Sequence, residues 1–244
     1  MRLSAMIDTV LWDNDGLLVD TEILFFEATR KAFARLRLVL TAELWSAQGM
    51  AGGRSTHDIA VSLGGEPKQV SDMIEERNRH YTRLLARPPR VLPQARETLT
   101  ALRGRVRLAM VTGSHRPDLD LMHRDTGLLD FFEVIVTGEE CVRAKPDPEP
   151  YRAATKRLGV APANCLAVED SPRGLASARA AGVACVVVPT DLTRGLQFPG
   201  AVAVERDVSA VLKHLPHFGG NPGIGGSQAV PESRSGAGRP QTSP

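Results

Sequence analysis

The sequence is poor in cysteine, in aromatic side chains and in long apolar runs, and each shortage excludes a class of protein. Its three cysteines, Cys141, Cys165 and Cys185, are odd in number and widely spaced, with no C-x-x-C pair. This pattern argues against a disulfide framework and a zinc knuckle, and it suits a reducing cytoplasm. Phe, Trp and Tyr make up only 5% of the chain, which argues against a base-stacking surface for nucleic acid.

Neither sign of charge is in clear excess. Lys and Arg number 30 against 28 Asp and Glu, which gives a net charge of +2 at pH 7, so no nucleic-acid or membrane partner is indicated. No apolar run approaches the ~20 residues of a membrane span, and Asp8 interrupts the apolar stretch that a signal peptide needs. The 244 residues, 42% of them hydrophobic, are enough for one good core and a smaller lobe. We expect a cytoplasmic globular protein.

The first apolar segment ends in two acids. Residues 6–12 are mostly apolar with a β-branched bias, and they predict a buried strand. Asp13 and Asp15 follow, and Gly16 lets the backbone turn sharply. Ligands bind at this edge of open α/β sheets, and two acids held there repel each other unless a cation or a phosphate site uses them. From these residues alone, an acidic surface turn is an equally good interpretation.

Residues 17–89 show helical periodicity and no convincing strand. Helices are expected from Asp20, from Thr41 to Trp45, from Ser55 or Thr56, and from Pro67 to Pro88, with Gly49, Gly52 and Gly53 ending the second. We therefore predict an all-helical lobe inserted after the first strand.

Beyond Val91, short apolar segments alternate with helical ones. Strands are expected at 106–111, 134–136, 165–168, 183–188 and, weakly, 201–204, with helices at 93–103, 117–126, 149–158, 172–182 and 207–214. This alternation is typical of βαβ units and a parallel sheet, so the predicted fold class is α/β, with its core over 1–16 and 90–218. Residues 219–244 are rich in Gly, Pro and Ser and poor in large apolar side chains, which predicts a disordered tail.

Polar residues follow four of the predicted strands, and the carboxyl ends of parallel strands share one edge of the sheet. These residues are Asp13 with Asp15, Thr112 with Gly113 and Ser114, Lys145, and Glu169 with Asp170. Carboxylates from two strands can hold Mg²⁺, while a hydroxyl and an ammonium can bind phosphate oxygens. One carboxylate can attack phosphorus, and a second can act as general acid and then base. The set is chemically complete for phosphoryl transfer.

Four segments resemble, in order and spacing, the motifs of the haloacid dehalogenase superfamily: Asp13-x-Asp15-Gly16-x-x-x-Asp20, Thr112, Lys145-Pro146-Asp147-Pro148 and Glu169-Asp170-Ser171. The helical insert over 17–89 resembles the C1 cap of the phosphoglycolate phosphatase and β-phosphoglucomutase-like branch. The resemblance implies a Rossmann-like parallel-sheet core with a small inserted α-helical cap.

The resemblance also implies a role for each motif residue. Asp13 would be the nucleophile, Asp15 the acid/base with its backbone carbonyl on the metal, Thr112, Gly113, Ser114 and Lys145 the phosphate-binding residues, and Asp13 and Asp170 Mg²⁺ ligands supported by Glu169. The implied activity is a Mg²⁺-dependent phosphatase that hydrolyses a small phosphorylated metabolite, such as a sugar phosphate or phosphoglycolate, through an aspartyl-phosphate. Dehalogenases resemble this sequence but lack a carboxylate at the position of Asp15, so its presence favours phosphate ester chemistry.

Two alternatives stay open. A β-phosphoglucomutase-like phosphomutase would share the core, but that branch typically carries a cap histidine, and no histidine precedes His57 here. A non-catalytic module similar to a receiver domain would accept phosphate on an aspartate, yet it needs neither a large cap nor an acid/base at Asp15. Arg54, in the glycine-rich part of the cap, could reach the substrate, although a solvated arginine is the simpler interpretation.

Overall fold

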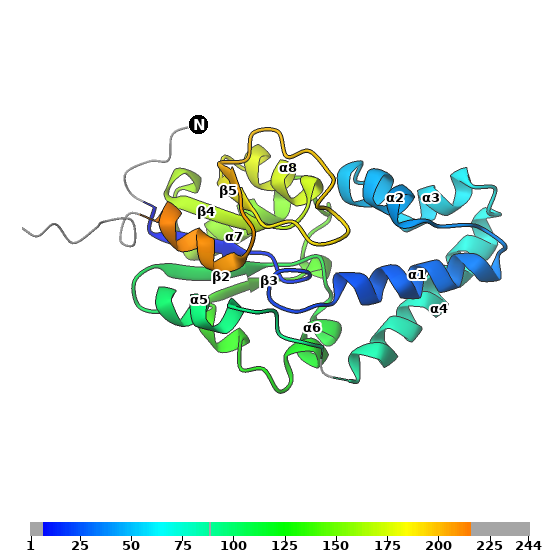
Figure 1. The fold of residues 1–244 in the computed structure, drawn as a ribbon, viewed down its shortest axis with the longest axis horizontal. Coiled ribbons are helices and arrows are strands. Elements are labelled where there is room, and N and C mark those ends of the chain that lie inside the picture. The colour runs from blue at the N-terminus through cyan, green and yellow to red at the C-terminus, as the bar shows by residue number, and fades with distance from the viewer. Residues whose placement is uncertain (1–6, 88, 216–244) are drawn as a thin grey trace, which may run out of the picture.

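The computed structural model describes residues 7–87 and 89–215, so the predicted tail at 219–244 lies outside the described part, as do Met6 and Pro88. Figure 1 shows a sheet-containing core with a group of helices beside it. All six strands of the sheet are parallel, in the order β3-β2-β1-β4-β5-β6. They are β1 (Thr9–Trp12), β2 (Arg107–Val111), β3 (Val134–Val136), β4 (Cys165–Glu169), β5 (Ala184–Val187) and β6 (Ala203–Val204). The predicted α/β fold class is confirmed.

The order of the strands reverses at β1. Trp12 of β1 is in register with Met110 of β2 on one side and with Val168 of β4 on the other. The chain therefore places β2 and β3 on one side of its first strand and β4 to β6 on the other. In doubly wound sheets, the crevice at such a reversal is where ligands bind. The residues that follow β1 therefore begin at this crevice, where a ligand is expected to bind.

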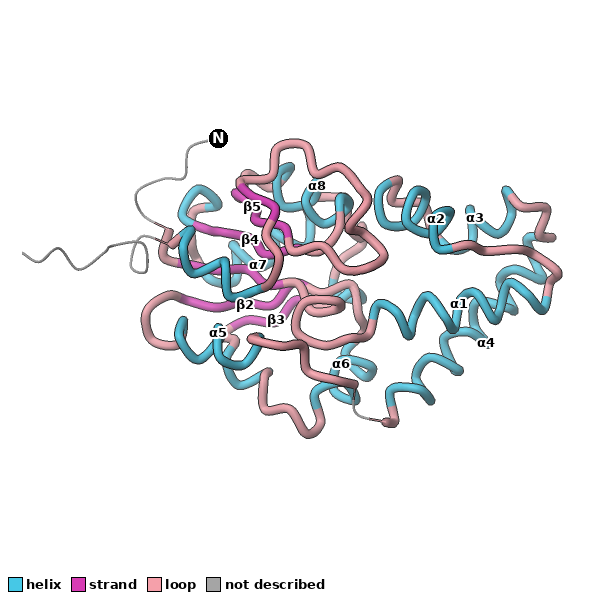
Figure 2. The backbone as a smooth tube through the Cα atoms, in the orientation of Figure 1, coloured by secondary structure: helices cyan, strands magenta, loops and turns pink. Residues whose placement is uncertain are grey.

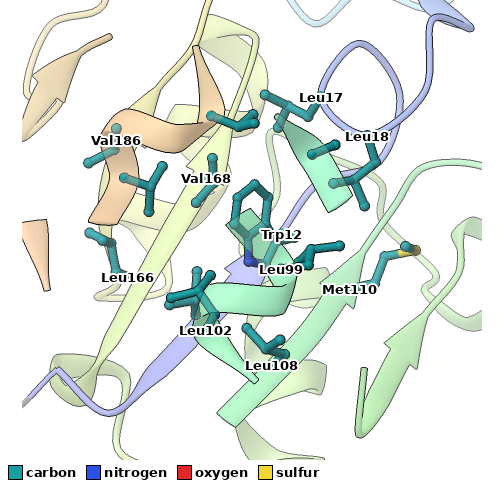
Figure 3. Close-up of a cluster of buried hydrophobic side chains, with 14 of the residues drawn as sticks. Trp12, Leu17, Leu18, Leu99, Leu102, Leu108, Met110, Leu166, Val168 and Val186 are labelled. Atoms are coloured by element: carbon teal, nitrogen blue, oxygen red, sulfur yellow. The ribbon is translucent and has the colours of Figure 1, made fainter. Parts of the chain in front are cut away.

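Helices cover both faces of the sheet, and the sheet is visible between them in Figure 2. One face carries α5 (Ala95–Leu102), α6 (Arg116–His123) and the 3₁₀ helix η5 (Val208–His214); the other carries α7 (Glu149–Leu158) and α8 (Pro172–Ala180). Three short 3₁₀ turns, η2 (Leu129–Phe131), η3 (Gly138–Glu140) and η4 (Pro162–Asn164), lie in connections. On the α5 face, Trp12 is surrounded by aliphatic side chains, among them Leu99 and Val168 (Figure 3). The predicted helix at 207–214 is thus of the 3₁₀ type.

The inserted lobe is helical, and no strand occurs between residues 22 and 85, all of which the structure describes. It consists of α1 (Glu22–Arg35), α2 (Ala42–Leu44), the π-helix η1 (Trp45–Ala51), α3 (Thr56–Ser62) and α4 (Pro67–Leu85). The hydroxyls of Thr41 and Ser55 accept hydrogen bonds from the first turns of α2 and α3, as N-cap residues do. We call this lobe the cap. Its exact boundaries at 16/17 and 89/90 stay predictions.

The prediction that Gly49 ends the second helix is wrong. The helix continues as a π-helix to Ala51, with Gly49 inside it. A Cβ atom at Gly49 would come within 3.3 Å of the Trp45 ring, so the glycine lets the helix pack against its own tryptophan. Trp45 and Met50 are both buried, and this burial outweighs the low helix propensity of glycine.

The cap leaves and re-enters the core through two neighbouring segments. Val19 forms a bridge with Val91, and the Leu92 amide donates a 2.9 Å hydrogen bond to the Leu18 carbonyl. The cap also touches the core farther out, where the Thr82 hydroxyl donates a 2.7 Å hydrogen bond to Asp118 of α6. The cap therefore contacts the core at a point beyond its two connecting segments. Within the described ranges, no helix combines the length and the apolar character of a membrane span.

Candidate active site

A tight turn after β1 positions the first two acids. The Asp13 amide donates a 3.0 Å hydrogen bond to the Val168 carbonyl, which extends the sheet by one residue. Gly16 then adopts φ +75°, and a Cβ atom there would come within 2.7 Å of Thr190 and 3.0 Å of the Asp170 carboxylate. Only glycine satisfies both the left-handed backbone and this close approach.

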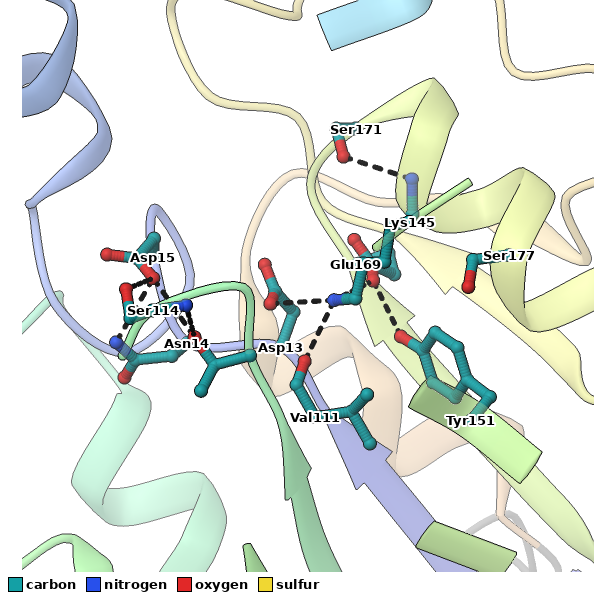
Figure 4. A network of polar contacts seen from close by, with 12 residues as sticks. Asp13, Asn14, Asp15, Val111, Ser114, Lys145, Tyr151, Glu169, Ser171 and Ser177 are labelled. Carbon is teal, nitrogen blue, oxygen red and sulfur yellow. Dashed lines mark hydrogen bonds and ion pairs between the residues drawn. The ribbon is translucent and has the colours of Figure 1, made fainter. Parts of the chain in front are cut away.

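Lys145 connects carboxylates from two strands (Figure 4). Its Nζ donates hydrogen bonds to Asp13 Oδ1 at 2.9 Å, to Glu169 Oε1 at 2.6 Å and to the Val111 carbonyl at 2.8 Å. These bonds use all three ammonium hydrogens. Tyr151 donates a further 2.6 Å bond to Glu169 Oε1. Burial by itself would lower the pKa of Lys145, but the charges of Asp13 and Glu169 outweigh it and raise the pKa, so the ammonium stays charged.

Asp13, Glu169 and Asp170 form a buried acidic cluster, in which one carboxylate oxygen from each lies within 4.8 Å of the others. Burial raises the pKa of all three carboxyls, and repulsion from neighbouring acids adds to the rise. Lys145 opposes the rise at Asp13 and Glu169. Glu169 Oε2 and Asp170 Oδ2 are buried without a hydrogen-bond partner among the described residues. Unpartnered carboxylate oxygens that repel one another are the donor set of a hard divalent cation such as Mg²⁺. The residues present therefore fit a metal.

The Asp15 side chain lies outside this cluster, held by hydroxyl groups. Its Oδ2 accepts hydrogen bonds from Ser114 Oγ at 2.8 Å and Thr112 Oγ1 at 3.3 Å, and its Oδ1 accepts one from Thr21 at 2.5 Å. The Ser114 amide in turn donates to Thr112 Oγ1 at 3.0 Å. Thr112 and Ser114, which we expected to bind phosphate, thus lie together, and their hydroxyls bind the Asp15 carboxylate.

One cavity of about 290 Å³ is lined by every predicted site residue: Asp13, Asp15, Thr112, Gly113, Ser114, Lys145, Glu169 and Asp170. The cap closes the cavity with the rings of Phe25, Trp45 and Tyr81, and with the polar segment 54–56. Phe25 meets Tyr81 edge to face, with ring centroids 5.1 Å apart. The core therefore lines one side of the cavity with charged groups, and the cap lines the other side largely with aromatic rings.

Sequence reasoning missed Glu22 and Arg173, which also line the cavity. Glu22 opens α1 and looks like an ordinary acid in a first helical turn, yet it is only 7% exposed. Burial raises the pKa of Glu22 to about 7, against the opposing charge of Arg173 and with added repulsion from Asp15 and Asp13. Its place directly after the first motif was the signal available in the sequence.

Comparison with known proteins agrees with this geometry. The family model described as haloacid dehalogenase-like hydrolase matches residues 7–182. Protein CbbY of Rhodobacter capsulatus is 33% identical over 224 residues, which cover 86% of this chain and 96% of that protein. The phosphorylated carbohydrates phosphatase of Thermotoga maritima is 31% identical over 222 residues, with 86% and 100% covered.

A solved structure gives the same result in three dimensions. CbbY from Rhodobacter sphaeroides, in complex with xylulose-(1,5)bisphosphate, has a TM-score of 0.70 at 28% identity, and the match covers 84% of this chain and 96% of that one. Relatives named phosphoglycolate phosphatase and β-phosphoglucomutase match as well. The predicted resemblance is confirmed: the chain belongs to the haloacid dehalogenase-like hydrolases, an enzyme family, in the capped branch of phosphoglycolate phosphatase and β-phosphoglucomutase.

Proposed function

We propose that this hydrolase is a Mg²⁺-dependent phosphatase that acts on a small phosphorylated metabolite through an aspartyl-phosphate. The observation that carries the proposal is the position of Asp13. Its carboxylate lies at the strand reversal, in contact with the Lys145 ammonium and within the acidic cluster that it forms with Glu169 and Asp170. A carboxylate that faces a fixed cation and a cation site is well placed to attack an anionic phosphoryl group.

Asp13 and Asp15 divide the chemistry. Asp13 attacks phosphorus, and the bond to the leaving oxygen breaks as Asp15 gives that oxygen a proton. Asp15 then takes a proton from water, whose oxygen attacks the aspartyl-phosphate, so that phosphate leaves and Asp13 is restored. The charge of the Lys145 ammonium, beside Asp13, attracts the phosphoryl oxygens, and Thr112 and its two neighbours bind them. Mg²⁺, held by Asp13, Asp170 and the backbone carbonyl of Asp15 with Glu169 beside them, would offset charge on those oxygens.

The cavity supports a substrate of the size of a phosphorylated sugar. Its volume of about 290 Å³ is at the lower limit of ligand pockets. One relative is named as a phosphatase of phosphorylated carbohydrates, and another binds xylulose-(1,5)bisphosphate. The polar segment 54–56, which contains Arg54, can meet hydroxyl or anionic groups of such a molecule, and Glu22 can meet hydroxyl groups. Three free cysteines, two of them buried, support the cytoplasm as the compartment of the enzyme.

The test replaces the nucleophile. Asp13→Asn should abolish hydrolysis of p-nitrophenyl phosphate, and acid quenching during turnover of a ³²P-labelled substrate should leave label on the wild-type protein and none on the variant. Asp125→Asn is the matched control, because that carboxylate is exposed in an ion pair with Arg124, and it should change neither result. Retained hydrolysis by the Asp13 variant would rule out the mechanism.

A phosphomutase is the alternative, since β-phosphoglucomutase of Bacillus subtilis is a relative. The described residues that line the cavity include no histidine, which favours the phosphatase. Supplying β-glucose 1-phosphate separates the two activities: a mutase makes glucose 6-phosphate, whereas a phosphatase releases free phosphate.

A further inference from the structure

Asn14, the residue between the two acids of the first motif, is fully buried and polar. Its side-chain oxygen lies 2.7 Å from Nε2 of His123, the last residue of α6. Its Nδ2 points to Asp15 Oδ2 at 3.4 Å and to the thioether of Met122 at 3.3 Å. Figure 4 shows Asn14 next to Asp15 and Ser114. The side chain thus connects the catalytic turn to a helix more than a hundred residues later in the chain.

The hydrogen bonds fix the proton positions on His123. The carbonyl oxygen of Asn14 only accepts, so His123 Nε2 carries the hydrogen. His123 Nδ1 is then an acceptor for the Thr126 hydroxyl, 2.9 Å away, which also donates to the His123 carbonyl at 3.3 Å. Burial lowers the pKa of His123 to about 4, so the ring is neutral at neutral pH. One directed chain of bonds therefore runs from Thr126 through His123 and Asn14 to the Asp15 carboxylate.

The backbone of Asn14 strengthens this anchor. Its carbonyl accepts hydrogen bonds from the amides of Leu17 at 3.2 Å and Leu18 at 2.9 Å. An apolar side chain at this position would fill the same space without the desolvation cost of a buried amide and a buried imidazole. A fully paired polar chain, in contrast, permits a single orientation of the groups that it joins.

We propose that His123 is a positioning residue that acts through Asn14 to hold the Asp13–Asp15 turn, so that the Asp15 carboxyl is aimed at the leaving-group oxygen. The inference rests on the proposed phosphatase activity, in which Asp15 protonates that oxygen. His123 does not line the cavity, so its effect on the reaction is transmitted by Asn14. The expected defect of a His123 variant is therefore specific to proton donation.

The experiment compares two leaving groups. p-Nitrophenolate leaves readily without protonation, whereas the alkoxide of an alkyl phosphate, such as a sugar phosphate that the wild type hydrolyses, depends on the acid. His123→Phe should lower kcat/KM for the alkyl phosphate by about 10-fold or more, within the range that general acid catalysis contributes, and should lower it much less for p-nitrophenyl phosphate. His123→Gln places an amide donor near the position of Nε2 and should restore most of the loss.

Two further variants keep the test decisive. The double variant Asn14→Leu/His123→Phe removes the buried amide and the buried imidazole together, and the Thr126 hydroxyl keeps its bond to the carbonyl of residue 123. It should therefore fold even if His123→Phe does not, and it should show the same selective loss on the alkyl phosphate. His214→Gln is the matched control. Like His123, His214 forms a side-chain hydrogen bond, to Glu205 at 2.7 Å, but neither residue lines the cavity. It should leave the ratio of the two rates unchanged.

The outcomes separate the two proposals. An equal loss on both substrates in the double variant, or no loss on either, would overturn the positioning role while leaving the phosphatase in place. A wild-type enzyme that hydrolyses neither ester, or an Asp13→Asn variant that still does, would instead refute the phosphatase mechanism.

Discussion

At the scale of single residues, Glu22 is an acid whose charged form its surroundings disfavour. It is the first residue of α1 in the cap, and it is buried near Asp13 and Asp15 with one oxygen unpartnered among the described residues. Its pKa rises from 4.5 to about 7 in the folded protein, so between these values the native state holds a proton that the unfolded state has lost. Stability from this group is complete below the lower value and is lost as the pH rises through the upper one.

Glu22→Gln removes this titration. In metal-free buffer the variant should lose less stability than the wild type between pH 5 and pH 8, by up to about 3 kcal/mol if the full shift is expressed. Urea unfolding in EDTA at several pH values measures the effect. Glu27→Gln, an exposed change on the same helix, should follow the wild-type curve. Parallel curves for Glu22→Gln and the wild type would show that Glu22 is not protonated in the fold.

At the scale of elements, the first turn of α8 is shaped around Glu169. A Cβ atom at Gly174 would overlap the Glu169 carboxylate, although Gly174 lies inside a helix, where alanine is ordinarily more stable by about 1 kcal/mol. Gly174→Ala should therefore destabilise the protein, by about 1–3 kcal/mol, and reduce activity, because Glu169 must move away from Lys145. Gly195→Ala, with open space around the added atom, should change stability little. A more stable Gly174→Ala variant would contradict this account of the turn.

Elements whose signals are local could be predicted from the sequence. Pro67 and Pro172 mark the starts of α4 and α8, because proline fits a first helical turn. The convergence of the motif residues could also be predicted, because the carboxyl ends of parallel strands lie at one edge of the sheet. The continuation through Gly49 could not be predicted, since it depends on the packing of Trp45. The roles of Glu22 and His123 depend on side chains that meet only after folding.

At the scale of the whole molecule, we expect the acidic cluster to make the free energy of unfolding depend on Mg²⁺. With Mg²⁺ at 100 times its dissociation constant, the free energy of unfolding should rise by about 2.7 kcal/mol, and EDTA should abolish turnover while the fold remains. Asp170→Asn should remove the Mg²⁺ effect, because it removes one of the clustered carboxylates. Asp191→Asn, whose side chain is 94% exposed, should retain it. Thermal unfolding with and without Mg²⁺ measures this effect. A wild type that unfolds at the same temperature in both conditions would show that the cluster holds no ion.

The paired segments at Val19 and Val91 give the molecule a modular character. Because the polypeptide leaves and re-enters the core at adjacent points, the helical lobe is an insert joined to the core by two neighbouring segments. Exchanging this lobe for another with a similar distance between its ends should leave Asp13, Glu169 and Asp170 in place on the core and change the side chains that face them.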